Sequence, residues 1–280
     1  MQQIKDLVAT DISRSLFEKI QRGISVADTT KYYISNSGSD SNDGTESKPF
    51  KTIEKCIETI RIKHGNNQLI TGIDIHFLSD YENTKTIRFS GFNRNIQFYF
   101  RNESHNVVLG GFSLHSNCVN FYNITFKPKE TFLNSSVHDV GFYSIAQYTN
   151  CTFYAPPIQL NYYFCCRYYS HIIFRGNCIV NLSNNENAIR GGIVASYAKG
   201  IVFHDGTITL GSDFTSASVI EVIRHGEYVT TKLASFDANG FTANAKKYRI
   251  ENYSFIDLLG KGEGMLLGNK AGELLDGKVY

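Results

Sequence analysis

Tryptophan is absent from this sequence of 280 residues, and proline and methionine are scarce, with 4 and 2 residues. Charged residues make up only 19%, and the formal net charge is +2. Without a basic run or a basic amphipathic helix, neither nucleic-acid binding nor attachment to an anionic membrane surface is expected. No stretch approaches the roughly 18 uninterrupted apolar residues of a transmembrane helix, so no membrane insertion is expected.

Cysteine is also sparse, and its pattern argues against two common uses. Six cysteines occur, and none forms a C-x-x-C pair. A structural zinc site normally needs such pairs, and a disulfide framework needs a higher density of cysteine. His171, His204 and His225 lack the spacing of metal ligands. We therefore expect buried free thiols, no metal and no other cofactor.

The amino-terminal residues lack the apolar core of a signal peptide. Charges interrupt them at Lys5, Asp6, Asp11 and Arg14. A secreted enzyme is therefore disfavoured, and a protein of this kind that works outside the cell is expected to leave by lysis or within a particle. Residues 4–22 instead predict a short helix that Gly23 ends.

Tyrosine and phenylalanine are abundant, with 17 and 20 residues, and Asn, Gly and Ser lie between them. This composition is typical of a β-rich chain with many turns. A strand is predicted at 32–35, a polar loop at 35–50 and an amphipathic helix at about 52–63 that Thr52 can cap. After that helix the pattern changes to short strands of period two.

A spaced repeat runs through these strands. Asn123 opens N-I-T-F, Asn150 opens N-C-T-F and Asn177 opens N-C-I-V, so the motif returns at a constant step. Asp205 opens D-G-T-I after nearly the same step, and Asn252 opens N-Y-S-F after a longer one that fits two shorter turns. A nearly constant period indicates the coils of a solenoid. The stacked asparagines are expected to form a hydrogen-bonded ladder.

Two alternatives to stacking stay open. Asparagines in the glycosylation pattern N-x-S/T include Asn102, Asn123, Asn150 and Asn252. Without a signal peptide, we favour stacking over glycosylation. Cys151 and Cys178 are expected one coil apart, about 4.8 Å, which a disulfide could bridge, but stacked thiols are favoured.

Residues 32–53, YYISNSGSDSNDGTESKPFKTI, resemble the opening of the pectate-lyase-like β-helix proteins that are common in phage and prophage tails. In that family a strand and a Gly/Asp/Ser-rich loop precede Pro-Phe-x-Thr-Ile and a helix that caps the solenoid. Residues 40–44 also resemble a calcium loop, but the glycine comes one residue early and Lys51 stands where an EF-hand has Glu. A structural turn is therefore predicted there.

The carboxyl-terminal residues resemble the closing coils of prophage tail proteins, which end in a Gly-rich turn, a Pro/Leu-Gly-Asn-x-Ala-Gly stretch and a terminal Gly-x-Tyr. The residues that match are Gly260, Gly262, Gly264, Gly268, Asn269, Ala271, Gly272, Gly277 and Tyr280. With the coil period, the resemblance implies an all-β, right-handed parallel β-helix. Its parts would be an attachment segment at 1–30, the β-helix at 31–260 and a Gly-rich tip at 261–280.

The same resemblance implies a homotrimer on a phage tail. Many tailspikes carry a separate head-binding domain, whereas only the short segment 1–30 precedes the β-helix here. Attachment to other tail or baseplate proteins is therefore expected through that short segment, or through another tail protein.

Members of this family either cut host polysaccharide or only bind it, and the fold does not decide between the two. If this chain is an enzyme, its candidate catalytic residues are Glu221, Glu227 and Asp205, and the first two belong to the dense polar cluster at 221–227. Carboxyls about 5 Å apart serve retaining hydrolysis, and neighbouring coils already provide nearly that spacing. The alternative is a solvated edge with surface ion pairs.

Binding has candidates in the segment 154–171, YAPPIQLNYYFCCRYYSH. Tyrosine offers apolar ring faces for sugar C–H groups and a hydroxyl for hydrogen bonds, and arginine can pair with an acidic sugar. The candidate carbohydrate-binding residues are Tyr162, Tyr163, Arg167, Tyr168 and Tyr169. Because strand side chains alternate, about half of these aromatic residues must point into the core or an interface.

The sequence therefore predicts a phage or prophage tail fibre or tailspike subunit that recognises bacterial surface polysaccharide during adsorption. It would be made in the host cytoplasm and would work on the virion. A polysaccharide depolymerase, hydrolase or lyase, on the same fold is the alternative.

Overall fold

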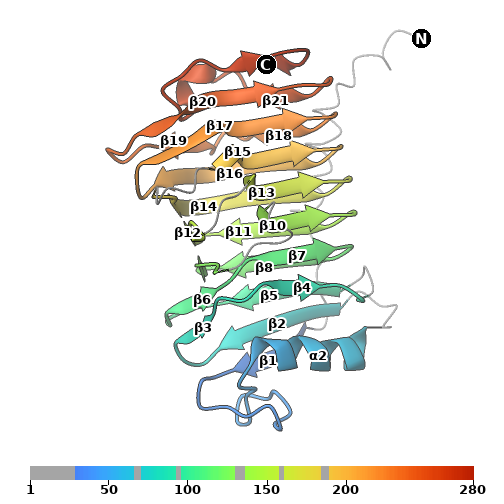
Figure 1. Cartoon of the computed structure of the whole chain (residues 1–280). Helices are drawn as coiled ribbons and strands as arrows, with labels where there is room; N and C mark the ends of the chain where they lie inside the picture. Colours follow the sequence, from blue (N-terminus) through green and yellow to red (C-terminus); the bar gives the residue numbers. More distant parts are fainter. Residues whose placement is uncertain (1–28, 66–70, 93–95, 130–135, 158–160, 184–188) are drawn as a thin grey trace, which may run out of the picture.

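The computed structural model describes residues 29–65, 71–92, 96–129, 136–157, 161–183 and 189–280. They form a parallel β-solenoid of about 7 turns (Figure 1). Strands account for 52% of the structure. The predicted all-β parallel β-helix is confirmed. The predicted helix at 4–22, and nearly all of the expected attachment segment, lie outside the described residues.

Two sheets, one of fifteen strands and one of eight, wrap around the core. Sheet B contains β4 (Ile87–Phe89), β7 (Phe112–His115), β10 (Ser136–Gly141), β13 (Tyr162–Arg167), β15 (Ile189–Tyr197), β17 (Phe214–Ile223), β20 (Ala243–Ile250) and β22 (Glu273–Leu274). Sheet A contains β1 (Thr29–Ile34), β2 (Thr71–Phe77), β5 (Ile96–Arg101), β8 (Cys118–Tyr122), β11 (Ile145–Thr149), β14 (His171–Asn181), β16 (Ile201–Leu210), β18 (Glu227–Thr230), β21 (Phe255–Asp257) and β23 (Lys278–Val279). It also contains β3 (Tyr81–Asn83), β6 (Val107–Leu109), β9 (Thr125–Phe126), β12 (Thr152–Tyr154) and β19 (Ser235–Asp237).

Sheet A bends at a corner within each coil, so the solenoid has three faces. β11 and β12 lie on either side of this corner, and the long strand β14 pairs with both of them. All the named pairs are parallel, and the register places Thr125 beside Thr152 and Thr152 beside Ile179. Each of these residues therefore lies one coil from the next, at the step of the asparagine motif, which confirms the predicted coil period.

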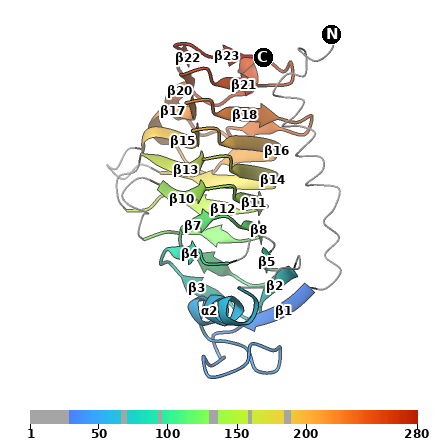
Figure 2. The ribbon, with the colours of Figure 1, turned by 90° about the vertical axis from the view of Figure 1, so that its right-hand side faces the viewer.

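A single α-helix, α2 (Ile53–His64), covers the amino-terminal end of the described solenoid (Figure 2). Thr52 caps it and accepts a hydrogen bond from the Lys55 amide. The predicted apolar face is the buried one. The preceding loop is a structural turn, as predicted, since the Asp40 carboxylate accepts hydrogen bonds from the Thr52 amide and hydroxyl at 2.9 Å each.

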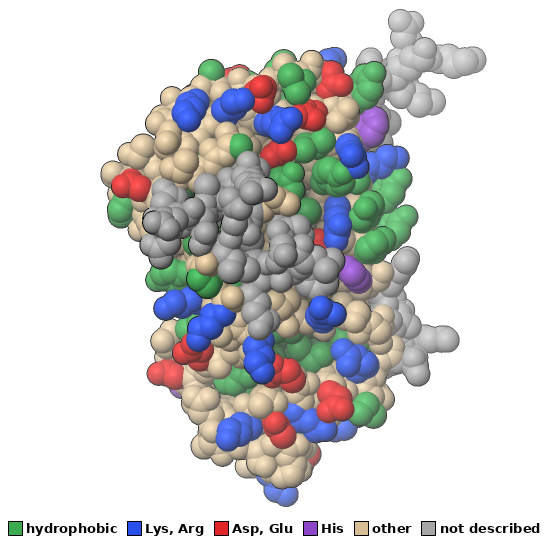
Figure 3. Space-filling view, viewed as in Figure 1, with side chains coloured by type: hydrophobic (Ala, Val, Ile, Leu, Met, Phe, Trp, Pro, Cys, Tyr) green, Lys and Arg blue, Asp and Glu red, His purple; other side chains and the backbone are tan. Residues whose placement is uncertain are grey.

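Charged side chains of both signs are spread over the visible surface (Figure 3), whereas the interior is built from stacked aromatic rings. Phe121, Tyr148 and Phe174 occupy one inward position in three successive coils, with ring centroids 5.8 and 5.6 Å apart. Phe126 and Phe153 stack at 5.3 Å in the neighbouring row. Each such pair contributes about 0.5–1.5 kcal/mol beyond its buried area. Coil stacking therefore supplies much of the core.

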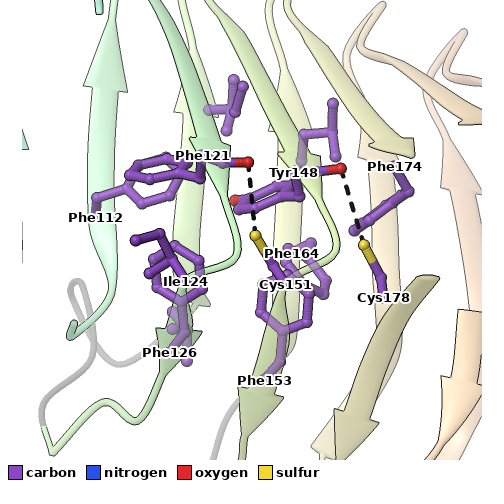
Figure 4. Close-up of a cluster of buried hydrophobic side chains, with 14 of the residues drawn as sticks. Phe112, Phe121, Ile124, Phe126, Tyr148, Cys151, Phe153, Phe164, Phe174 and Cys178 are labelled. Carbon is purple, nitrogen blue, oxygen red and sulfur yellow. Dashed lines mark hydrogen bonds between the residues drawn. The ribbon is translucent and has the colours of Figure 1, made fainter. Parts of the chain in front are cut away.

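Cys151 stacks on Cys178 as predicted, because Thr152 and Ile179, the residues that follow them, are paired (Figure 4). Both thiols are buried, and they donate weak hydrogen bonds to the carbonyls of Phe121 and Tyr148. All six cysteines are free. The disulfide alternative is therefore wrong in this structure.

The predicted ladder of Asn123, Asn150 and Asn177 forms only in part, through side-chain to backbone bonds. The Asn123 side-chain amide donates to the Asn102 carbonyl at 2.9 Å, and Asn150 Oδ1 accepts from the Asn177 backbone amide at 2.9 Å. Asn123 and Asn150 have φ of 56° and 53°, a left-handed conformation that asparagine tolerates well. In the next coil Gly176, with φ of 60°, takes this place, so Asn177 lies one residue beyond it.

Two members of the predicted repeat are misaligned. Asp205 lies beside Arg175, and Asn177 lies beside Thr207. Asn252 belongs to the other end of the sheet A strands, in the turn between β20 and β21. Both corners favour residues that adopt positive φ, so asparagine recurs at each of them.

Candidate functional site

Short turns join each sheet B strand to the following sheet A strand, and five of them share one conformation. In each, two successive residues other than glycine have φ between 49° and 65°. These pairs are Phe142–Tyr143, Tyr168–Tyr169, Ala198–Lys199, Arg224–His225 and Asn252–Tyr253. We call these ten residues the turn ridge. Positive φ is costly for bulky side chains, and such strain often marks functional sites.

Stacking of the coils holds these turns in place. The Tyr143 amide donates to the Tyr168 carbonyl at 3.1 Å, and the Tyr168 amide donates to the Ala198 carbonyl at 3.0 Å. The third residue of every turn is serine or glycine and is buried. A Cβ at Gly200 would lie 2.3 Å from the Cys166 carbonyl oxygen, which shows how closely these backbones approach.

The aromatic side chains of the turn ridge point outward. Their exposed fractions range from 37% for Tyr168 to 77% for Tyr253. Phe142 stacks on Tyr168 with centroids 4.9 Å apart, and Tyr143 stacks on Tyr169 at 5.3 Å. Figure 3 shows hydrophobic side chains along the right-hand edge of the molecule, with Lys, Arg and His among them. The turns therefore present a rigid, amphipathic strip parallel to the solenoid axis.

Three cationic or titratable groups lie in the same strip. Lys199 Nζ is 2.9 Å from the Tyr169 hydroxyl and 5.1 Å from the centre of its ring. This hydrogen bond raises the pKa of Lys199. The Arg224 guanidinium lies 4.8 Å from the Tyr197 ring centroid, and His225 stacks on Tyr253 at 5.9 Å. Such a surface can pack against sugar C–H groups and pair with anionic substituents.

The predicted binding residues lie in three places: on the turn ridge, on the outer side of sheet B and in the core. Tyr168 and Tyr169 lie on the turn ridge, as the prediction needs. Arg167 lies beside it, but its guanidinium pairs with Asp139 at 2.7 Å. Tyr162 is half-buried on sheet B, and its hydroxyl faces Glu221 at 3.4 Å.

Tyr163 is a correction to the predicted binding set. Its exposed fraction is 0%, and its hydroxyl donates to the Tyr154 carbonyl at 2.8 Å. Tyr163 and the adjacent Phe164 both enter the core, so side-chain alternation breaks at this point of β13, and the two rings make an edge-to-face contact at 4.8 Å. Tyr163 therefore cannot contact a ligand at the surface.

The predicted catalytic residues do not share one site. Glu221 lies on β17 in sheet B, whereas Asp205 and Glu227 lie on β16 and β18 in sheet A. Asp205 accepts a hydrogen bond from the Thr231 hydroxyl at 2.5 Å. Glu227 pairs with Ile201, which lies four residues before Asp205 on β16. Glu227 and Asp205 are therefore separated along the strand direction. Of the three, Glu221 lies in a cluster of acids and bases.

That cluster follows one outward row of sheet B, in which Glu221, Arg249 and Glu273 are successive neighbours. Glu221 is 3% exposed, and burial raises its pKa, an effect that Arg249 partly offsets. Arg249 lies 3.8 Å from Glu221 and 3.7 Å from Glu273, and it also pairs with Glu251. The hydrogen bond from Lys246 lowers the pKa of Glu273. The pKa values of Glu221 and Glu273 are thus displaced in opposite directions.

Sequence reasoning missed several turn-ridge residues outside the 154–171 segment, above all Phe142, Tyr143 and Tyr253. A signal was present, because F-Y-S, Y-Y-S, A-K-G, R-H-G and N-Y-S recur at close to the coil period. Each triplet ends in a small residue directly before a strand. The pattern becomes recognisable only once the first two positions are known to have positive φ.

Among the described residues, no helix combines the length and apolar character that crossing a membrane requires. In the same part of the chain, no group of three His, Cys, Asp or Glu side chains could hold a metal ion. Comparison with known proteins found no match to this chain among family models, curated proteins or solved structures.

Proposed function

We propose that this protein is a phage or prophage tail fibre or tailspike subunit that recognises bacterial surface polysaccharide during host adsorption. The observation that carries the proposal is the turn ridge on an elongated parallel β-solenoid. Exposed Phe or Tyr rings lie in three of its five turns, and cationic or titratable side chains, Lys199 and Arg224–His225, lie in the other two, so a polymer lying along the axis would meet a side chain suited to sugar contact in successive coils about 4.8 Å apart. A rigid ridge also loses little conformational entropy on binding.

The assembly belongs to the same proposal. Residues 1–30 would attach the subunit to other tail or baseplate proteins on the virion, and three copies would associate. Exposed apolar side chains of the last coil, at Leu274, Leu275 and Tyr280, support contact with another chain. Sedimentation of the purified protein tests this association, for which a trimer is the expected species.

The direct test is incubation of the purified protein with surface polysaccharide from candidate host strains. Retention of the protein on intact polysaccharide is the expected result. Polymer length and new reducing ends are followed in the same samples. Polysaccharide is prepared from every strain to which the intact phage adsorbs. If none of these polysaccharides retains the protein, receptor recognition by this chain is wrong.

A polysaccharide depolymerase is the second candidate, favoured by the opposed pKa displacements of Glu221 and Glu273. They are two strand steps apart, about 10 Å at the backbone. Inverting glycosidases separate their carboxyls by about 6.5–9.5 Å and use a raised-pKa acid to protonate the leaving oxygen. Glu221 would be this acid, and Glu273 would activate water. Asp139 lies three steps from Glu221, roughly 14 Å, which is too far for either role.

Glu221→Gln is the corresponding variant. If the chain cuts polysaccharide, this change is expected to slow the formation of reducing ends by about 100-fold or more, because general-acid assistance contributes that much. Binding to the turn ridge should persist. Glu58→Gln on the exposed side of α2 is the matched control and should leave the rate unchanged. Full cleavage by Glu221→Gln would exclude this assignment.

A further inference from the structure

The side chains of the turn ridge that are charged near neutral pH are cationic. Its ten residues include Lys199, Arg224 and His225 and no Asp or Glu. In the whole chain, 28 Lys and Arg stand against 26 Asp and Glu. The ridge therefore departs from a nearly balanced composition.

These groups also lack acidic partners. Among the described residues, none of Lys199, Arg224 and His225 forms an ion pair with a carboxylate. On sheet B the pattern is the opposite, because Arg167 pairs with Asp139 and Arg249 pairs with Glu221. The charges of Arg167 and Arg249 are thus neutralised within the protein, whereas those of Lys199 and Arg224 remain available to a ligand.

The placement of Lys199 and Arg224 joins charge to the aromatic surface. They occupy consecutive coils, and the Lys199 amide donates to the Arg224 carbonyl at 3.2 Å. The Lys199 ammonium lies against the ring of Tyr169, which in turn stacks on Tyr143. A ligand that covers these rings would therefore place its next unit beside two exposed cations.

We propose that the turn ridge binds an acidic polysaccharide, whose anionic groups pair with Lys199 and Arg224 while its neutral parts pack against the rings of Phe142, Tyr143, Tyr168 and Tyr169. This inference rests on the proposed function and names the chemical class of the receptor. The anion is a carboxylate or a phosphate. The polymer runs parallel to the solenoid axis, because the rings and cations succeed one another in that direction.

The test compares an acidic polysaccharide with its matched neutral form and with a second acidic polymer that carries phosphate. The probes are polygalacturonate, its carboxyl-reduced neutral form, and a poly(glycerol phosphate). At 50 mM salt the wild-type protein is expected to bind at least one acidic probe about tenfold more tightly than the neutral polymer, since only the acidic probe can make charge-assisted hydrogen bonds to the two cations. The preference should shrink at 300 mM salt. The two acidic probes distinguish carboxylate from phosphate.

A double variant, Lys199→Ala with Arg224→Ala, is expected to lose the charge preference and to keep its affinity for the neutral polymer. Lys48→Ala with Lys51→Ala, which removes two exposed cations near α2, is the charge-matched control and should keep the preference. Equal binding of acidic and neutral probes, an unchanged preference in the ridge variant, or binding of neither acidic probe would overturn the inference. The proposed function is judged separately, on host polysaccharide.

Discussion

Acidification from pH 7 to pH 4 is expected to destabilise the solenoid by several kcal/mol, because three histidines are buried and, among the described residues, pair with no carboxylate. Burial lowers the pKa of His171 to about 4 and of His204 to about 3, and it lowers the pKa of His138 well below the ordinary value of 6.5. Each unit of difference between folded and unfolded states corresponds to about 1.4 kcal/mol. The three histidines therefore make the free energy of unfolding strongly dependent on pH.

The free energy of unfolding falls at acid pH because the unfolded chain binds more protons than the folded chain. Above pH 6.5 these rings are neutral in both states, and their full contribution to stability is present. As the pH falls below 6.5, the unfolded chain takes up protons that the folded chain excludes, so the free energy of unfolding decreases. The decrease continues until the pH reaches the folded-state pKa, near 4 for His171 and near 3 for His204. Chemical denaturation at a series of pH values measures it.

His138 is the most informative of the three. It lies between Phe112 and Phe164 in one row of sheet B, and both its ring nitrogens lack a hydrogen-bond partner among the described residues. His138→Phe would continue this row of rings. We expect it to raise the free energy of unfolding by about 1–3 kcal/mol at pH 7 and to reduce its fall at acid pH.

A matched control separates titration from packing. Phe164→Leu changes a neighbouring buried ring without removing a titratable group, so it should lower stability by a similar amount at every pH. A free energy of unfolding that stays constant from pH 7 to pH 4 in the wild-type protein would contradict the prediction. The prediction would also be contradicted if the free energy of unfolding of His138→Phe fell with pH as steeply as that of the wild-type protein.

The coil architecture was predictable because its signals are local and repeated. Asn150 adopts positive φ and Cys151 packs inward, and each occupies the same position as its counterpart one coil earlier, so the spacing could be read from a few letters. The capping helix was equally accessible, since Thr52 and the apolar residues that follow it form a helix signal within one segment. Interactions across many coils are not needed for either prediction.

The position of each tyrosine was not predictable, because it depends on strand phase. Tyr162 and Tyr163 are adjacent, and alternation requires that one points inward, but both sides of β13 carry apolar residues. In the structure Tyr163 and Phe164 are both buried, so β13 departs from strict alternation, and the sequence pattern could not show which tyrosine points inward. The separation of Glu227 and Asp205 from Glu221 was equally hidden, since their proximity in sequence says nothing about which sheet they join.

The second large expected effect concerns the turn ridge. Replacing Tyr168 by Asn together with Tyr169 by Gly removes two exposed rings and keeps the backbone conformation, because Asn-Gly is the pair best suited to two successive positive φ values. Removing both rings is expected to weaken polysaccharide binding by about 100-fold, or ~2.8 kcal/mol, the loss typical of a central aromatic contact. Binding is measured with the receptor polysaccharide by calorimetry.

The stability of this variant separates a binding role from a structural one. If Tyr168 and Tyr169 are retained for binding, they strain the turn, so the Asn-Gly variant should be at least as stable as the wild type while it fails to bind. Tyr154→Ala is the matched control, because Tyr154 has similar exposure, 38%, but lies on β12 in sheet A, and it should bind normally. Normal binding by the Asn-Gly variant would exclude the turn ridge as the receptor site. A large loss of stability with the loss of binding would instead identify these rings as structural, since their stacking on Phe142 and Tyr143 would then be what holds the coils together.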